Sequence, residues 1–202
     1  MISDSLFIKA KFWASILGRM PGVLAVFLSG SLAQNKANKD SDIDFFVVAK
    51  KGQIWTARFF IFLILKISGQ MRNSKNPTGK ICPNHFITHQ SLEIAEKDAY
   101  SANLFSHAKP LYDPQNLYPE FVQNNKHWWE KFGEQSPDTE KKERTVPIKK
   151  ISSVSLFLEK WLRSWQIRKI KSNPEYKIPG AKIILEDTEL RFHPHPKNKS
   201  FK

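Results

Sequence analysis

Two strand patterns, joined through a glycine-serine pair and ending in two aspartates, constrain this chain more than any other feature. Residues 23–28 form a continuous apolar run with β-branched members, as expected for a buried strand. The run stops at Ser29-Gly30-Ser31, and a second strand pattern covers residues 43–49. Ten residues separate Ser31 from Asp42, which is enough for a short helix and a return loop. The segment therefore predicts strand, short helix, loop and strand in succession.

The polar residues of this segment suit phosphate and metal binding. Gly30 would let a phosphate approach the backbone closely, and Ser31 adds a hydroxyl donor. Asp42 and Asp44 would project from one face of a strand, because side chains alternate along it. Two adjacent carboxylates repel unless a cation lies between them, and sites rich in oxygen suit Mg²⁺. An isolated Asp-x-Asp is more often a solvated pair, so this interpretation depends on the preceding Gly-Ser.

Gly-Ser, a spacer of ten residues and Asp-x-Asp between apolar residues resembles the signature of the DNA polymerase beta-like nucleotidyltransferase superfamily. The resemblance is strongest over residues 23–48. Within that superfamily it is similar to small bacterial nucleotidyltransferase-domain proteins, which include aminoglycoside-modifying and antitoxin-type enzymes. It implies an α+β fold with a mixed β-sheet flanked by helices, here followed by a C-terminal helical extension. It also implies Mg²⁺-dependent transfer of a nucleoside monophosphate from an NTP, expected to be ATP, to an acceptor hydroxyl.

The resemblance assigns roles to individual residues. Asp42 and Asp44 would bind the metal and act in catalysis, and Gly30 and Ser31 would hold the triphosphate. Lys39, in the spacer, is a further candidate for phosphate contact, with a solvated loop position as the alternative.

One element of the family pattern has no counterpart in this sequence. The pattern adds a third carboxylate on a later strand, but residues 81–86 contain no acid. Asn84 could ligate a metal through its carbonyl, and His85 could accept a proton; a buried polar pair is an equally good interpretation. The alternative function is therefore a catalytically impaired nucleotide- or nucleic-acid-binding protein, or an antitoxin-like partner, that retains the fold.

The rest of the chain divides into further predicted elements. Helical patterns cover residues 6–17, 54–67, 91–107 and 119–132, with a third strand at 80–88 and a turn or short strand at 110–114. We expect a catalytic domain over 1–132, a linker over 133–148, and a C-terminal helix with an irregular tail over 149–202. That helix runs to about Lys171, with one apolar stripe expected to pack in the core, formed by Ile151, Val154, Leu158, Trp161 and Trp165.

Charge and composition limit the partners. The chain has 32 Lys and Arg against 19 Asp and Glu, a net charge of +13, of which +8 lies in residues 121–202. Such an excess favours anionic partners: an NTP, with nucleic acid as a further candidate. Cys82, the only cysteine, excludes an internal disulfide and a cysteine-built zinc site. The apolar run 59–65 is too short to cross a bilayer, so we expect a cytoplasmic protein without a membrane partner. The pattern singles out no particular acceptor and no oligomeric state.

Overall fold

The computed structural model describes residues 2–73, 76–139, 148, 152–174 and 182–193 of the chain. The predicted boundaries of the first three strands and of three helices agree with the structure to within a few residues. In chain order the elements are α1 (Ile2–Leu17), β1 (Val23–Ser29), α2 (Gly30–Ala33), β2 (Ile43–Ala49), α3 (Ile54–Ile67), β3 (Ile81–Thr88), α4 (Ala99–Ser106), β4 (Lys109–Tyr112), α5 (Tyr118–Trp129), η1 (Glu130–Phe132), α6 (Ser153–Lys171), β5 (Lys182–Leu185) and β6 (Glu189–His193).

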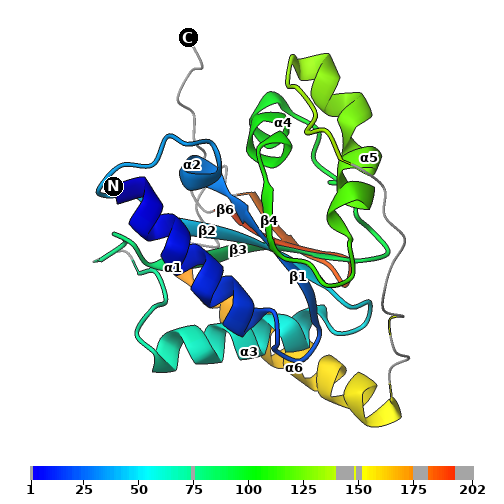
Figure 1. Cartoon of the computed structure of the whole chain (residues 1–202). Coiled ribbons are helices and arrows are strands. Elements are labelled where there is room, and N and C mark those ends of the chain that lie inside the picture. Colours follow the sequence, from blue (N-terminus) through cyan, green and yellow to red (C-terminus); the bar gives the residue numbers. More distant parts are fainter. Residues whose placement is uncertain (1, 74–75, 140–147, 149–151, 175–181, 194–202) are drawn as a thin grey trace.

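The architecture is a six-stranded mixed sheet between two layers of helices, which confirms the predicted α+β class. The strand order is β4-β1-β2-β3-β6-β5, and β2 and β3 are parallel whereas the other neighbours are antiparallel. Helices α1, α3 and α6 lie on one side of the sheet and α4 and α5 on the other (Figure 1). Among the residues that the structure describes, no helix combines the length and apolar character needed to cross a membrane.

Strand β2 lies inside the sheet and contributes side chains to both cores. Phe45 and Val47 are buried in the core under α1 and α3, whereas Phe46 and Val48 are buried in the core under α4 and α5. Because side chains alternate along a strand, Asp44 shares the α4 and α5 side with Phe46. The acidic residues therefore lie at the beginning of a strand whose remainder is fixed by apolar packing on both faces.

Helix α4 is shorter than its sequence pattern predicts. The prediction covered residues 91–107, but the helix begins at Ala99, where the Asp98 carboxylate accepts a hydrogen bond of 2.7 Å from the backbone N–H of Ser101. This is an N-cap contact, and it marks the first turn. Before it, the side chain of Asn125 accepts from the N–H of Ile94 and donates to the carbonyl of Leu92. Those groups thus find partners without a helix.

The tail also departs from expectation. Within the segment predicted to be irregular, β5 and β6 form a hairpin, and β6 pairs with β3 so that His85 lies opposite Arg191. Leu190 of β6 is fully buried in the core. The hairpin covers what would otherwise be an exposed edge of β3. Residues 175–181 and 194–202 of the tail, and residues 140–147 of the expected linker, lie outside the described part of the chain.

Helix α6 forms where it was predicted, but a different face packs inward. Val154, Leu158, Trp161 and Trp165 are all exposed, so the expectation of a buried apolar stripe is wrong for them; Ile151 lies outside the described residues. The inward residues of α6 are a carboxylate, a leucine and an amide: Glu159, Leu162 and Gln166. Polar anchoring to α3 therefore decides the orientation of this helix.

Glu159 supplies the N-terminal cap that α3 lacks in its own sequence. The N-cap residue of α3, Gln53, makes no side-chain cap hydrogen bond. Instead the Glu159 carboxylate accepts from the backbone N–H groups of Trp55 at 2.9 Å and Thr56 at 2.8 Å, and from the Thr56 hydroxyl at 2.6 Å. A carboxylate at a helix N-terminus is favoured by the helix dipole as well as by these hydrogen bonds. The contact joins residues more than a hundred positions apart.

We expect Glu159→Ala to lower the free energy of unfolding by about 3 kcal/mol, because two buried backbone donors and a buried hydroxyl would lose their acceptor. Chemical denaturation followed by circular dichroism measures this loss. Lys160→Ala, at an exposed position of the same helix, should change it by less than about 0.5 kcal/mol. Equal effects of the two substitutions would contradict the capping role.

A buried polar cluster joins the β5–β6 hairpin to β3 and α4. His85 Nε2 lies 2.9 Å from Glu189 Oε1, without the alignment of a regular hydrogen bond. Arg191 is fully buried and donates to the Ser101 hydroxyl at 2.9 Å and to the Glu96 carboxylate. Burial lowers the pKa of His85, and the nearby Glu189 only partly opposes this effect. His85 is therefore neutral in the folded chain at neutral pH.

The neutral state of His85 predicts a pH-dependent stability. An unfolded histidine takes up a proton below pH of about 6.5, but folded His85 does so only at lower pH, so the free energy of unfolding should fall as pH falls from 7 to 5.5. Denaturant titrations across this window should give a flatter pH dependence for His85→Gln than for the wild type. Glu189, whose pKa is also lowered in the fold, loses its contribution only below this window. Identical slopes for both proteins would contradict the assignment.

Candidate functional site

The turn from β1 into α2 requires glycine for two separate reasons. Ser29 ends β1 directly opposite Asp44 of β2. The next residue, Gly30, has a φ of +71°, a conformation that L side chains rarely adopt. A Cβ atom on Gly30 would lie 2.2 Å from the Asp44 Oδ2 atom. The bare backbone of Gly30 is therefore packed against the Asp44 carboxylate.

The other residues expected to contact phosphate lie on the same connection between β1 and β2. Ser31 is partly exposed in α2, and its hydroxyl makes a long contact of 3.4 Å with the hydroxyl of Ser41. Ser41 in turn accepts a hydrogen bond of 2.9 Å from the backbone of Asn38, which orders the loop. Lys39 is exposed on this loop. Gly30 and Ser31 thus flank the aspartates, whereas Lys39 projects from the loop into solvent.

The structure brings Asp42 and Asp44 together with a residue that sequence reasoning missed, Cys82. One carboxylate oxygen of each aspartate and the Cys82 sulfur all lie within 4.8 Å of one another, and all three side chains are partly exposed. Cys82 is there because β2 and β3 run parallel with Asp44 opposite Cys82 in the register. We call Asp42 and Asp44 the acidic pair. The third member of this cluster is therefore a thiol and not a carboxylate.

Arg72 is a second missed residue. Its Nε atom donates to the Asp42 Oδ2 atom at 2.7 Å, and its guanidinium lies 3.9 Å from the Cys82 sulfur. The acidic pair is thus partly neutralised by a guanidinium of this chain. Arg72 belongs to a polar stretch whose sequence indicates only a loop, so no sequence pattern predicts its contact with Asp42. The proximity of Cys82 to the aspartates could have been predicted only if the parallel register of β2 and β3 were known.

The Cys82 thiol is uncharged in this setting. Burial raises its pKa to about 12, and the neighbouring carboxylates of Asp44 and Asp42 act in the same direction, against the opposing effect of Arg72. A thiolate, by contrast, is the form of cysteine that acts as a metal ligand or nucleophile. The cluster therefore offers two carboxylates and a neutral sulfur.

Asn84 contacts the acidic pair through its amide nitrogen. Its Nδ2 atom donates to the Asp44 Oδ1 atom at 2.8 Å. The register passes from Phe45 opposite Pro83 to Phe46 opposite His85, so Asn84 is an extra residue in β3, a β-bulge. In this arrangement Asn84 holds the Asp44 carboxylate in place.

His85 does not reach the acidic pair. The bulge turns it to the same side of the sheet as Asp44. It lies opposite Phe46, two residues after Asp44 in β2, where its side chain is only 1% exposed. Its ring centroid lies 5.0 Å from those of both Phe46 and Phe105. The expectation that His85 serves as a base is therefore corrected: it is a core residue paired with Glu189.

The donor set of the acidic pair fits a hard divalent cation. Mg²⁺ in proteins is usually held by one or two carboxylates together with waters and substrate phosphates. Two carboxylates supply this set, Asp42 just before β2 and Asp44 within it, and the backbone of Gly30 is packed against the second. A neutral thiol is a poor ligand for such a cation, which prefers oxygen. Asp42 and Asp44 could thus hold one magnesium ion.

Comparisons with known proteins find similarity over part of the chain. Residues 11–78 match the family model described as the nucleotidyltransferase domain, and the matched segment ends before β3. No curated protein sequence matches the chain. A crystal structure described as a toxin-antitoxin with AMP-PNP is similar at 17% sequence identity and a TM-score of 0.35, covering 56% of this chain and 84% of the other. Residues 11–78, which contain Gly30, Ser31, Asp42 and Asp44, are therefore similar to the nucleotidyltransferase domain family.

Proposed function

We propose that the protein is a Mg²⁺-dependent nucleotidyltransferase that acts on a nucleoside triphosphate. The observation that carries the proposal is the acidic pair, whose Asp44 lies against the bare backbone of Gly30, within the segment matched by the nucleotidyltransferase family. The Asp44 carboxylate leaves no room for a side chain at Gly30, at the end of a buried strand. A solvated pair of aspartates would not require such a glycine. It is useful where phosphate oxygens and a metal must approach the backbone closely.

Each residue of the site has a proposed role. Asp42 and Asp44 hold Mg²⁺, which when bound offsets the negative charge of the triphosphate. The backbone of Gly30 and the hydroxyl of Ser31 position the phosphates, with Lys39 available from the loop. Asn84 acts as a positioning residue, because its amide holds the Asp44 carboxylate.

The proposed transfer is a single displacement. The oxygen of an acceptor hydroxyl forms a bond to the α-phosphorus while the bond between the α-phosphorus and its bridging oxygen breaks. Pyrophosphate leaves, and the hydroxyl proton passes to solvent water. Catalysis of this step depends on positioning and on charge stabilisation by the site.

We expect the double variant Asp42→Asn, Asp44→Asn to bind Mg²⁺ and non-hydrolysable ATP at least about tenfold more weakly than the wild type, because neutral amides replace both carboxylate ligands. Isothermal titration calorimetry measures the affinity. Asp40→Asn, at an exposed position on the preceding loop, is the matched control and should bind as the wild type does. Unchanged affinity in the double variant would remove the basis of the metal assignment.

A nucleotide-binding protein that does not catalyse transfer is the second candidate function. The observation that favours it is Cys82, which lies beside Asp44 and adds a neutral thiol, not a third carboxylate, to the acidic pair. With two carboxylates and a neutral thiol, the site has ligands for one metal ion but no further acid to activate the acceptor. ATP binding without pyrophosphate release would favour this candidate over the transferase.

The position of Cys82 gives a gain-of-function test. Cys82→Asp would place a third carboxylate beside the acidic pair, and we expect it to raise the affinity for Mn²⁺, a paramagnetic substitute for Mg²⁺, by about tenfold or more. Electron paramagnetic resonance measures the free Mn²⁺. Cys82→Ser, which has similar size and no charge, should leave the affinity near that of the wild type. If Cys82→Asp binds Mn²⁺ no more tightly than Cys82→Ser, this position is not part of the metal site.

A further inference from the structure

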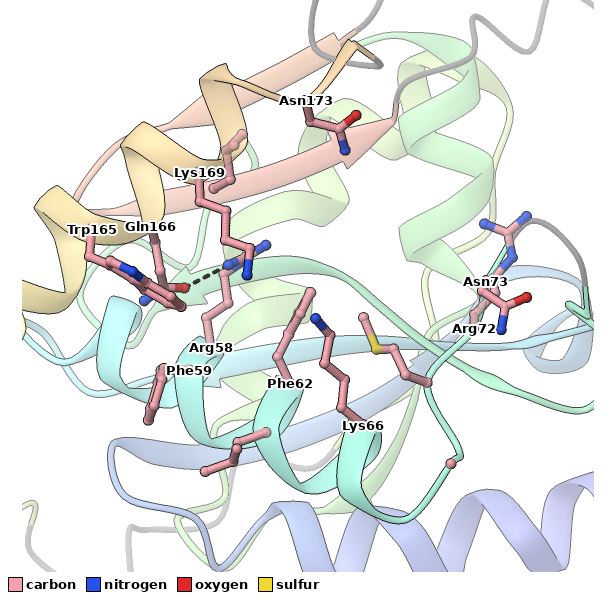
Figure 2. Close-up of a pocket in the computed structure, with 14 residues that line it drawn as sticks. Arg58, Phe59, Phe62, Lys66, Arg72, Asn73, Trp165, Gln166, Lys169 and Asn173 are labelled. Atoms are coloured by element: carbon pink, nitrogen blue, oxygen red, sulfur yellow. Dashed lines mark hydrogen bonds between the residues drawn. The ribbon is translucent and has the colours of Figure 1, made fainter.

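A cleft of about 790 Å³ lies between α3 and α6. Trp165 stands at one end of the cleft and Arg72 at the other (Figure 2). Among the described residues that line it there is no Asp or Glu. Its lining is instead cationic and aromatic, with Arg58, Lys66, Arg72 and Lys169 as the cations and Phe59, Phe62 and Trp165 as the aromatic residues.

Arg58 in the wall of this cleft carries a charge that no carboxylate balances within the described part of the chain. Its guanidinium lies 4.1 Å from the ring centroid of Phe62 and 4.6 Å from that of Phe192, and it donates to the Gln166 side chain at 2.6 Å. Its Nε atom is buried without a hydrogen-bond partner. Burial lowers the pKa of Arg58 to about 9. A half-buried cation held only by rings and an amide is poorly solvated until an anion binds.

The end of the cleft that contains Trp165 has the chemistry of a stacking platform. Trp165 is 39% exposed and makes an edge contact with Phe59, with ring centroids 6.0 Å apart. Lys169 Nζ lies 5.1 Å from the centroid of the Trp165 ring. An exposed aromatic ring beside a lysine suits a ligand in which a flat base and a phosphate occur together.

We propose that the α3–α6 cleft binds single-stranded nucleic acid, with phosphates on Arg58, Lys66 and Lys169 and a base on Trp165. The cations are distributed along the cleft from Lys169 to Arg72, and this spread suits a chain of phosphates rather than a single one. Only a single strand presents its bases to a ring inside a cleft, because a duplex keeps them stacked.

Arg72 connects this cleft with the acidic pair. It lines the cleft and donates to the Asp42 carboxylate, so a strand bound there would end beside the site of transfer. The strand would then be the acceptor, and this part of the inference rests on the proposed function. Binding of the strand does not depend on it.

The test is fluorescence anisotropy with a short fluorescein-labelled single-stranded oligonucleotide of mixed sequence, titrated with the full chain in the absence of Mg²⁺ and ATP. We expect the double variant Lys66→Gln, Lys169→Gln to bind at least about tenfold more weakly. The slope of the logarithm of affinity against the logarithm of salt concentration should shrink by about 1.4, since each lost phosphate contact in a single strand contributes about 0.7. Both lysines are exposed, so the fold is preserved, which thermal unfolding checks.

Two matched controls lie on α6 outside the cleft. Lys160→Gln should leave both the affinity and the salt slope unchanged, although it removes the same charge. Trp165→Ala should weaken binding about fivefold or more through lost stacking, whereas Trp161→Ala, one turn away, should have little effect. If the double lysine variant keeps the affinity and salt slope of the wild type, the proposal is wrong. It is equally overturned if free ATP displaces the oligonucleotide at equal nucleotide concentration, because the cleft would then be a mononucleotide site.

The two proposals can fail separately. The double variant Asp42→Asn, Asp44→Asn should bind the oligonucleotide as the wild type does, because neither residue lines the cleft. The double lysine variant should bind Mg²⁺ and ATP as the wild type does. Loss of oligonucleotide binding in the aspartate variant would contradict a separate strand-binding cleft.

Discussion

The close packing of the Asp44 carboxylate against the backbone of Gly30 is the constraint on which the site depends. It fixes the end of β1 against the beginning of β2, where Ser29 and Asp44 are opposite each other. The rest of β2 is held by apolar packing on both sides of the sheet. The strand therefore cannot slip by a residue to relieve contact at Asp44, because a slip would turn Phe45 and Phe46 to the wrong cores. A hydrophobic register thus holds a polar site in place.

Much of the first half of the chain follows from local sequence. The runs that form β1, β2 and α3 are strongly apolar and end at clear turn residues, so their bounds are nearly those predicted. The positions of Gly30, Ser31 and the aspartates follow from the same pattern. The local pattern gives the wrong structure where contacts with residues far away in the sequence determine it. Asn125 satisfies backbone groups of residues 92 and 94 and so replaces a predicted helix, and Glu159 rather than the tryptophans of α6 faces inward.

The cluster of Asp42, Asp44, Cys82 and Arg72 could be predicted only in part from the sequence, for the same reason. Asp42 lies just before β2 and Asp44 within it, and their proximity follows from the two-residue period of the extended chain. Cys82 and Arg72 reach them through the parallel pairing of β2 with β3 and through the connection after α3. The bulge at Asn84 also changes which residues of β3 face the aspartates, so simple alternation would place His85 wrongly. The missing information is the register between strands.

The cap that Glu159 places on α3 has a consequence for how the chain acquires its structure. The first turn of α3 is completed by a residue more than a hundred positions later, and the β3 edge is covered by a hairpin about as distant. Contacts of such sequence separation form late, because a long loop must close first. During synthesis, the segment with the aspartates therefore leaves the ribosome before its supporting helix exists. Until then α3 has an uncapped end and β3 an open edge, so the emerging chain is most exposed to aggregation in that interval.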